Sequence, residues 1–553
     1  MRNMTKINGP LLRCGLVAAA SMVVANAQAA TFGISSAPPV APPASPAVAS
    51  TFNLSATAAF ISQPDGASIY SWGYGCSAGT AVFKPDSNAG TCTTMQLPGP
   101  TLIVTEGDTV TVTLTNNLPP AAGRTSILFP GFDVTAIGGS AGLLAKEASV
   151  GGSVTYSFVA KTPGTHSYYS GTQGDLQVEM GLYGALVVIP KLTGSGGNLP
   201  KNYVKTANSP NTCFGPGAKV PLKADEDDQR LAAAAYDHPA ACYDREYLFQ
   251  FSELDPVIHR QAEEQSGVPC AVSTGCMTVA TEPYHPTYYM INGRSFPDDT
   301  DPSYAEQYPH QPYNGNPHMH PGELVLLRIV GQGRMQHPFH EHANHVRVLA
   351  RDGNLLLNGA GSLAGPLMFT TSTTPGLAMD GIFQWTGKGL NWDVFGHGKK
   401  NGVAIVTNDD SNHCVPDANG YFTNGSTAAG HATGSEPNYY EWCGDHGKSL
   451  ESKPFGNVGD DGPITLPDPT IVANGAWYGG SPYLGGEATV RAVGSTPIPP
   501  SGTVANDPGE EAGFAYMWHS HNEREITTNN IFPGGMMMMM LVDPWVFTID
   551  EAK

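Results

Sequence analysis

Short runs in which apolar and hydroxyl-bearing residues alternate constrain the fold of this chain more than any other feature. The clearest run is TLIVTEGDTVTVTLTNNLP (Thr101–Pro119), where Val and Leu alternate with Thr on either side of Glu-Gly-Asp. Because successive side chains of a strand point to opposite faces, this period of two predicts a hairpin of two half-buried strands. Further strand-like runs are GLYGALVVIP, REYLFQFSEL, YYMINGRSFP, GELVLLRIVG, HVRVLARDG and GFAYMWHSH.

The composition suits a folded chain built from such strands. The chain has 553 residues, of which 41% are hydrophobic and 14% charged, so it can bury sizeable cores. Its 65 glycines and 46 prolines are typical of many strands joined by turns, and no long amphipathic helix pattern is present. The sequence therefore predicts an all-β fold made of sandwiches.

The first residues, 1–29, have the pattern of a signal peptide. Basic residues precede an apolar core, and Ala27-Gln28-Ala29 fits a cleavage motif. No later run approaches the roughly 18 apolar residues that a membrane helix needs. We expect a secreted or periplasmic protein without a transmembrane segment, and its formal charge of −20 disfavours nucleic acid as a partner.

Changes in composition divide the rest of the chain. A Pro/Ala/Ser-rich stretch predicts a tether, and a long Gly/Asn/Asp/Pro-rich stretch predicts an insertion. The expected segments are a linker at 30–50, a first sandwich at 51–195, a connection at 196–244, and a second sandwich at 245–545 with an insertion at about 398–512. An alternative places the insertion and the C-terminus in a third sandwich.

Eight of the nine cysteines follow the signal, and they fall in near-neighbour pairs. An even number of cysteines in an oxidising compartment indicates disulfides, and none of them adjoins a histidine cluster as a copper thiolate would. The expected bridges are Cys76–Cys92, Cys213–Cys242, Cys270–Cys276 and Cys414–Cys443.

Two clusters of histidines point to the chemistry. HPFHEH contains His337, His340 and His342, and WHSH contains His519 and His521. In each His-x-His pair, the two imidazoles project from the same face of an extended segment. Imidazole binds copper, zinc, iron and nickel, and two separate pairs are hard to explain as packing. The spacing therefore predicts a metal site.

These motifs resemble those of the multicopper oxidases. HPFHEH is similar to the family's His-Pro-x-His-x-His motif, and WHSH is similar to its His-Cys-His motif. Other similar pieces are LPGPTLIVTEGDTVTVTLTNNLP, GLYGALVVIP, MINGRSFP and the late GGM, so the resemblance covers most of residues 51–545. It implies two cupredoxin-like Greek-key sandwiches, copper as the cofactor, and oxidation of small molecules or metal ions at a blue copper coupled to a trinuclear cluster.

The chain departs from the family pattern in the first sandwich. Leu128 and Pro130 in TSILFPGF, and Tyr169 and Gly171 in GTHSYYSGTQ, stand where the family has histidines. By this alignment, all four ligands that the first sandwich would give to the copper cluster are missing.

The blue-copper motif is altered as well. Ser520 replaces the cysteine of His-Cys-His, and a hard, protonated hydroxyl cannot replace a soft thiolate. By the resemblance, His337 and Met536 correspond to the two remaining ligands of that site. Glu523 and Glu525 follow, and we interpret this charged run as a solvated turn; the alternative is that one of them orients an imidazole.

Two other features have competing interpretations. His318 and His320 in NPHMHPGE are either a further metal pair or surface residues of a loop. The run Met536–Met540 offers soft ligands for cuprous ion, but its period of two favours a buried core strand.

The sequence thus predicts an exported copper protein similar to multicopper oxidases, with a reduced site. Its expected ligands are His340, His342, His519 and His521, with His337 as a further candidate, while catalytic residues stay undefined. We expect an oxidoreductase. The alternatives are a copper-binding or copper-handling protein without turnover, and a degenerate cupredoxin scaffold for adhesion or assembly.

Overall fold

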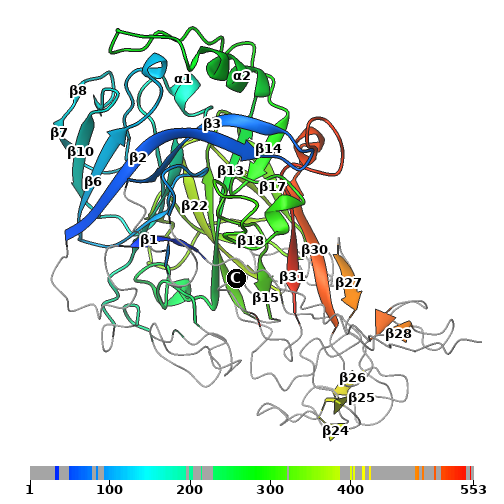
Figure 1. Ribbon diagram of the computed structural model, residues 1–553. Coiled ribbons are helices and arrows are strands. Elements are labelled where there is room, and N and C mark those ends of the chain that lie inside the picture. The colour runs from blue at the N-terminus through cyan, green and yellow to red at the C-terminus, as the bar shows by residue number, and fades with distance from the viewer. Residues whose placement is uncertain are drawn as a thin grey trace, which may run out of the picture.

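Two pairs of larger β-sheets form the framework of the computed structural model (Figure 1), and each pair encloses its own hydrophobic core. The structure describes residues 31–35, 49–77, 92–194, 199–203, 213, 228–320, 323–385, 515–543 and 549, together with the backbone of a few short strands between them. The expected signal peptide at 1–29 lies outside the described residues, as does nearly all of the expected insertion. The prediction of an all-β fold is confirmed.

The first sandwich consists of two five-stranded sheets. One has the order β11-β12-β5-β1-β4, with bounds Gly164–Tyr169, Tyr183–Ile189, Leu102–Thr105, Gly33–Ser35 and Phe83–Lys84. The other has the order β3-β2-β6-β10-β7, with bounds Ser68–Cys76, Ala49–Ser62, Thr109–Asn116, Ser153–Val159 and Thr135–Gly138. Because β1 lies within the stretch expected to be a tether, the first sandwich includes residues that precede position 51.

The strands within Thr101–Pro119 do not form the expected hairpin. β5 pairs with β1 and β12, whereas β6 pairs with β2 and β10 in the facing sheet. The chain passes between the sheets at Gly107, whose φ is +87° and whose N–H donates to Ala160. The alternation correctly predicts the half-buried β6, but a period of two does not identify the partner of a strand.

The second sandwich is built from two longer sheets. One has the order β14-β13-β16-β22-β18-β19, with bounds Tyr288–Ile291, Arg245–Leu254, Leu324–Gly331, Ala378–Gln384, Val346–Arg351 and Asn354–Leu355, and β20 (Leu367–Met368) pairs with β18. The other has the order β15-β31-β30-β17-β21, with bounds His318–Met319, Met537–Val542, Ala512–Ser520, His337–Glu341 and Thr370–Thr373. β27 (Gly480–Leu484), from the expected insertion, pairs with β30.

The methionine run forms part of the core between these sheets, as predicted. Met538 and Met540 are fully buried together with Trp518 and Phe339, while Met539 is only partly buried. The alternation follows from the pleat of β31. These methionines therefore stabilise the sandwich by packing.

Helices are few and short in the described parts of the chain. The longer helix is α2 (Pro256–Gln265), which begins with Asp255, whose side chain accepts a hydrogen bond from Val257 N at 2.9 Å. An acidic residue at this position together with proline in the first turn favours a helix start. α1 (Gly174–Gln177) precedes β12. No helix in the described part of the chain is long and apolar enough to cross a membrane.

Buried polar contacts join the two sandwiches. Asp380 on β22 accepts hydrogen bonds from Thr165 of β11, at 3.1 Å from its N and 2.6 Å from its Oγ1. The hydroxyl of Tyr236 also donates to Asp380, and Arg328 lies 3.7 Å from it. Removing such a buried carboxylate leaves its partners unsatisfied, so this contact contributes to holding the sandwiches together.

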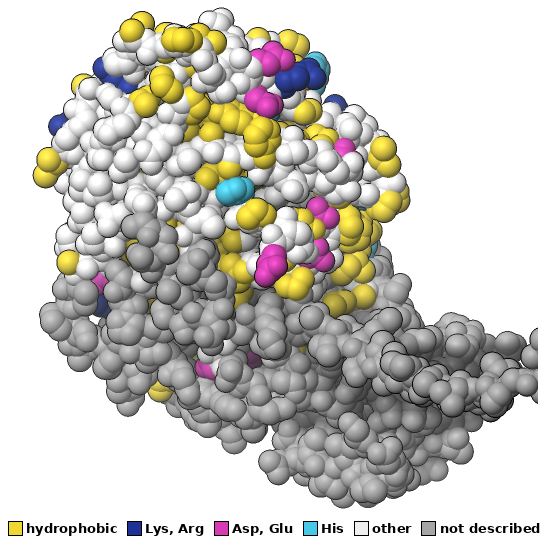
Figure 2. Space-filling model, viewed as in Figure 1, with side chains coloured by type: hydrophobic (Ala, Val, Ile, Leu, Met, Phe, Trp, Pro, Cys, Tyr) yellow, Lys and Arg dark blue, Asp and Glu magenta, His cyan; other side chains and the backbone are white. Residues whose placement is uncertain are grey.

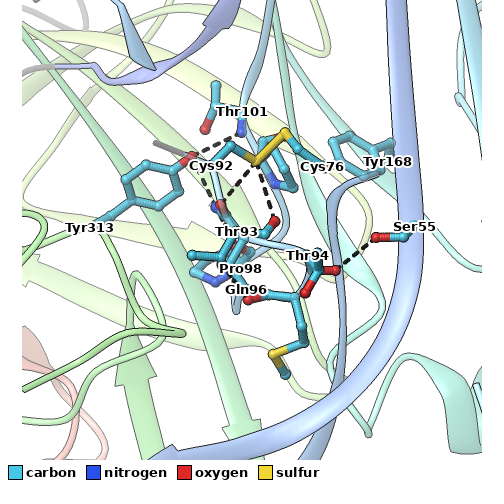
Figure 3. The surroundings of a disulfide bond; sticks show 12 residues. Ser55, Cys76, Cys92, Thr93, Thr94, Gln96, Pro98, Thr101, Tyr168 and Tyr313 are labelled. Atoms are coloured by element: carbon cyan, nitrogen blue, oxygen red, sulfur yellow. Dashed lines mark hydrogen bonds between the residues drawn. A yellow bond between two sulfur atoms is a disulfide. The ribbon is translucent and has the colours of Figure 1, made fainter. Parts of the chain in front are cut away.

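Three of the four predicted disulfides are present: Cys76–Cys92, Cys213–Cys242 and Cys270–Cys276. Cys414 and Cys443 lie outside the described residues. Figure 3 shows the Cys76–Cys92 bridge beside Gln96, whose Nε2 donates to the hydroxyl of Tyr313 at 3.1 Å. Tyr313 comes from the chain that follows β14, so this bridge lies at a second junction between the two halves of the sequence.

The connection before the second sandwich is more buried than its composition suggests. Leu231 to Ala235 are at most 3% exposed, and Ala235 and Tyr236 pack against Leu326 and Ile382 of the second sandwich. Small alanines fit where the chain passes close to a sheet.

On the face drawn in Figure 2, charged side chains are few and scattered over the described surface.

Candidate metal centre

Antiparallel pairing of β17 with β30 brings the two histidine motifs together. His340 lies directly opposite His519, and Phe339 lies opposite Ser520. The backbone N–H of His521 donates to Pro338 O at 2.7 Å, which extends the pairing by one residue. Because a pleated strand alternates its side chains, His340 and His519 project from one face, and Phe339 turns into the core.

The four imidazoles converge on this face. Ring centroids are 4.6 Å apart for His340 and His342, 5.3 Å for His340 and His521, and 5.8 Å for His340 and His519. They are 5.1 Å apart for His342 and His519, and 5.7 Å for His519 and His521. The sequence prediction that these residues meet thus agrees with the arrangement in the structure.

Hydrogen bonds fix the orientation of two of these rings. Nδ1 of His340 donates to Phe369 O at 2.5 Å, and Nδ1 of His519 donates to Ser520 O at 2.7 Å. With the proton on Nδ1, the lone pair lies on Nε2 of each ring. A backbone carbonyl that holds the non-coordinating nitrogen is the arrangement typical of metal-ligating histidines.

The environment of two of the imidazoles, His340 and His519, favours their neutral form. Burial lowers the pKa of His340 to about 4, and the neighbouring His342 lowers it further in the same direction. Burial also lowers the pKa of His519. Neutral imidazole is the form that binds a metal, so no proton has to leave these two rings at neutral pH. His342 is half-buried and His521 is exposed, so the cluster is open to solvent on one side.

The donor set fits a borderline ion such as copper. Four imidazoles arranged tetrahedrally around one ion, with nitrogens about 2.0 Å from it, have ring centroids about 5 Å apart. Nε2 of His342 and Nε2 of His519 are 3.1 Å apart, close enough for one proton or one cation to lie between them. Within the described residues, no group of three or more His, Cys, Asp or Glu side chains is already arranged to hold a metal ion. Binding would therefore require the rings to turn towards a common point.

His337 is separate from this cluster. It is fully buried on the opposite face of β17, where its Nε2 lies 3.0 Å from Glu253 Oε2 and its Nδ1 lies 2.9 Å from Glu525 Oε2. Burial opposes protonation, but the neighbouring carboxylates of Glu253 and Glu525 outweigh it and raise the pKa of His337 to about 9. Both ring nitrogens thus face carboxylates, and neither presents a lone pair to a metal.

The acidic run after His521 is not entirely a solvated turn. Glu523 is exposed, as expected, whereas Glu525 is fully buried. Ser520 Oγ donates to Glu525 Oε2 at 2.5 Å, and Asn522 Nδ2 donates to Glu525 Oε1 at 2.9 Å. The prediction was wrong for Glu525 because the 3₁₀ turn Glu523–Ile526 folds this side chain back into the core. Its imidazole partner is His337.

Three of the four replaced positions in the first sandwich line a cavity. Leu128 and Tyr169 form a β-bridge, and Leu128 fills the space beside Gly171. The cavity has a volume of about 290 Å³ and lies between these residues and Gln332, Gly333, Pro375 and Gly376 of the second sandwich. None of the four clustered histidines lines it.

His318 and His320 are buried, so their interpretation as surface residues is wrong. His318 Nδ1 donates to Asp543 Oδ2 at 2.6 Å, and His320 Nδ1 lies 3.2 Å from both Glu323 and Arg245. The cationic guanidinium beside His320 disfavours a metal ion there. These histidines act as polar partners within the sandwich.

Sequence reasoning missed the acidic residues behind the histidines. Glu253, on β13, is fully buried; its Oε1 accepts hydrogen bonds from the N–H groups of Arg334 and Met335 at 2.6 and 2.8 Å, and from Tyr284. In the sequence it is one polar residue in REYLFQFSEL. Only the arrangement of the sheets shows that it meets His337.

Residues 77–193, which span most of the first sandwich, match the family profile described as multicopper oxidase. L-ascorbate oxidase of Brassica rapa subsp. pekinensis is 37% identical over 99 residues, which are 17% of this chain and 16% of that protein. Multicopper oxidase MCE of Talaromyces pinophilus is 34% identical over 117 residues, which are 21% of this chain and 18% of that protein. The matched stretch thus spans less than a fifth of each of these relatives.

Two solved structures are similar only in outline. The blue copper oxidase from Nitrosomonas europaea has a TM-score of 0.40 at 14% identity, over 89% of this chain and 85% of that one. The multicopper oxidase mgLAC has a TM-score of 0.41 at 14% identity, over 91% and 89%.

Two β-sandwiches and a partly open cluster of four histidines define the class as a β-sandwich protein with an imidazole-rich site. The sequence matches go further. The part of the chain that they cover, residues 77–193, is similar to the multicopper oxidase family.

Proposed function

We propose that this protein is an exported copper oxidoreductase with a reduced copper site, in which His340, His342, His519 and His521 hold the metal. The observation that carries the proposal is the convergence of four imidazoles on one face of β17 and β30. The family implies copper, and soft-to-borderline nitrogen ligands favour it over calcium or magnesium.

The residues of the chain have distinct tasks in this proposal. Phe369 O and Ser520 O hold His340 and His519 so that Nε2 is the ligating nitrogen. The exposed side at His521 leaves room for a small molecule or a metal ion to approach. Copper bound there would supply one-electron redox chemistry. Leu128, Pro130, Tyr169 and Gly171 contribute no imidazole, so a complete trinuclear cluster is not part of this proposal.

A second candidate function is copper binding or copper handling without turnover. The observation that favours it is the burial of His337 between Glu253 and Glu525, which leaves the chain without a second copper position near Ser520. The protein would then lack a second copper, separate from the histidine cluster, at which a substrate could be oxidised. A third candidate, a copper-free scaffold, is supported by the replaced ligands alone.

Metal analysis of variants tests the site. Replacing His340 and His521 together with Ala should remove most of the bound copper, since two of four ligands are lost, while the far-ultraviolet circular dichroism stays unchanged. His285→Ala removes an exposed histidine outside the cluster and should keep the copper content of the wild type. Full copper content in the double variant would place the metal elsewhere and refute the site.

Oxygen consumption separates the candidate functions. The proposed oxidoreductase should consume oxygen with at least one member of a panel of phenols and reduced metal ions, and the double variant should lose this activity. Copper binding without oxygen consumption would favour copper handling. Wild-type protein that takes up no copper would leave the scaffold interpretation.

A further inference from the structure

A chain of buried ionisable groups occupies the region behind the histidine cluster. His337 lies between Glu253 of β13 and Glu525 of the 3₁₀ turn, and all three side chains are at most 1% exposed. The two carboxylates approach opposite edges of the imidazole ring, one at each nitrogen. An imidazole with an acceptor at both nitrogens satisfies both contacts only when both nitrogens carry protons.

Each of the two carboxylates also accepts hydrogen bonds from other donors. Glu253 accepts hydrogen bonds from two backbone N–H groups and from the hydroxyl of Tyr284. Glu525 accepts from Ser520 Oγ and from Asn522 Nδ2. Two buried carboxylates without a cation between them would be costly, so these donors and the carboxylates together favour a positive charge on His337. The pKa of about 9 agrees with this arrangement.

The residues around this network are the ones that the motif comparison relates to a blue-copper site. Ser520 N donates to Met536 O at 2.9 Å, and Met536 N donates to Glu525 O at 2.8 Å. Ser520, Met536 and His337 therefore meet around Glu525. A hard hydroxyl, a single thioether and an imidazole without a lone pair do not fit copper there.

We propose that the imidazolium of His337, held between Glu253 and Glu525, takes the place that a metal ion would have beside Ser520 and Met536, so that no metal binds at this position. The internal cation supplies the positive charge that the two buried carboxylates require. The proposal does not depend on whether the four-histidine cluster binds copper, because the two groups lie on opposite faces of β17.

Nitrogen NMR of the protein labelled with ¹⁵N-histidine tests the protonation state directly. The His337 signals, assigned by their loss in His337→Asn, should show two protonated nitrogens at pH 7 and titrate near pH 9. Glu525→Gln should lower the pH of that titration, while Glu523→Gln, which changes an exposed neighbour in the same turn, should not. A His337 with one unprotonated nitrogen at pH 7, or a titration unaffected by Glu525→Gln, would overturn the proposal.

A designed thiolate tests the exclusion of metal. Ser520→Cys restores the cysteine of His-Cys-His, yet copper per chain should stay at the wild-type value and no intense blue absorption should develop, because His337 remains protonated. Ser170→Cys, at a buried serine of the first sandwich, controls for thiols that bind copper without a built site. One extra copper per chain with a blue band in Ser520→Cys alone would refute the proposal.

Discussion

At position 520 the side chain ends in an oxygen atom where the related His-Cys-His motif has sulfur. The structure shows what the oxygen does instead: it donates a hydrogen bond to Glu525, an interaction that a copper thiolate does not make. The change of one atom thus accompanies a different set of interactions around residue 520. A buried ion pair between His337 and the carboxylates lies where the related motif would have the ligands of a blue copper.

We expect the copper-loaded protein to lack an intense blue colour. That absorption arises from charge transfer between copper and a thiolate, and the described cysteines are paired in disulfides away from the histidine cluster. Visible absorption spectroscopy after copper titration checks this. An intense blue band would contradict both this prediction and the assignment of Ser520 to the cysteine position.

The free energy of unfolding should fall as the pH rises from about 6.5 to about 9. The folded-state pKa of His337 lies above its ordinary value of 6.5, so its contribution is complete below pH 6.5 and is lost as the pH passes 9. The loss should be on the order of 3 kcal/mol for the wild type. Glu179, whose pKa burial raises to about 8, adds a loss in the same direction.

Denaturant unfolding at several pH values in Glu525→Gln and Glu523→Gln isolates the contribution of His337. The slope between pH 6.5 and 9 should become smaller in Glu525→Gln and keep its wild-type value in Glu523→Gln. Equal slopes in all three proteins would show that the carboxylate of Glu525 does not hold the proton on His337.

The sequence predicted individual site residues only where the spacing of side chains indicates a chemical role. A spacing of two residues on a strand puts both rings on one face, so the sequence could predict which side chains form the histidine cluster. They are His340, His342, His519 and His521. Glu525 could not, since a charged residue after a strand usually lies in a solvated turn. Its burial depends on a 3₁₀ turn whose path is determined by contacts with residues distant in the sequence.

At the scale of elements, the register between β17 and β30 creates the histidine cluster. A shift of one residue would turn one pair of imidazoles into the core and Ser520 or Phe339 outwards. Strand existence was predicted well, since β13 has the bounds Arg245–Leu254 that its sequence run suggested. Strand pairing was not predicted correctly, because β5 and β6 follow each other in the chain but lie in opposite sheets.

The contact between β11 and β22 should be important for stability. Asp380→Ala removes the acceptor of Thr165 and Tyr236 and leaves them unsatisfied in the core, so the free energy of unfolding should fall by about 3–5 kcal/mol. Asp133→Ala breaks an ion pair with Lys161 whose side chains are 90% and 63% exposed, and should change nothing measurable. Equal stability of the two variants in urea unfolding would mean that the sandwiches do not depend on Asp380.

At the scale of the whole molecule, composition and period were enough to predict an all-β fold, because few other arrangements bury one face of so many strands. They were not enough to predict how the chain before the second sandwich runs. Residues 231–235 read as a small-residue connection, yet they are buried. Division of the chain into domains at 195 and 245 stays a prediction.

We expect the fourth disulfide, Cys414–Cys443, in addition to the three that the structure contains. The reason is the parity and the local spacing of the cysteines, for which the three described pairs set a consistent precedent. Peptide mapping without reduction should yield a cross-linked peptide that contains both residues. A bridge from either of them to a different cysteine, or two free thiols, would refute the pairing.

The exposure of His521 at the edge of the histidine cluster has a kinetic consequence. A metal enclosed within a protein leaves only when the surrounding structure opens, so its residence time follows the opening rate. In the proposed copper site, the side chain of His521 is exposed to solvent, so a competing small chelator can approach it while both sandwiches stay closed. The rate of metal exchange would then depend on how fast the bonds between metal and imidazole break. It would not follow the opening rate that hydrogen exchange of the backbone amides measures.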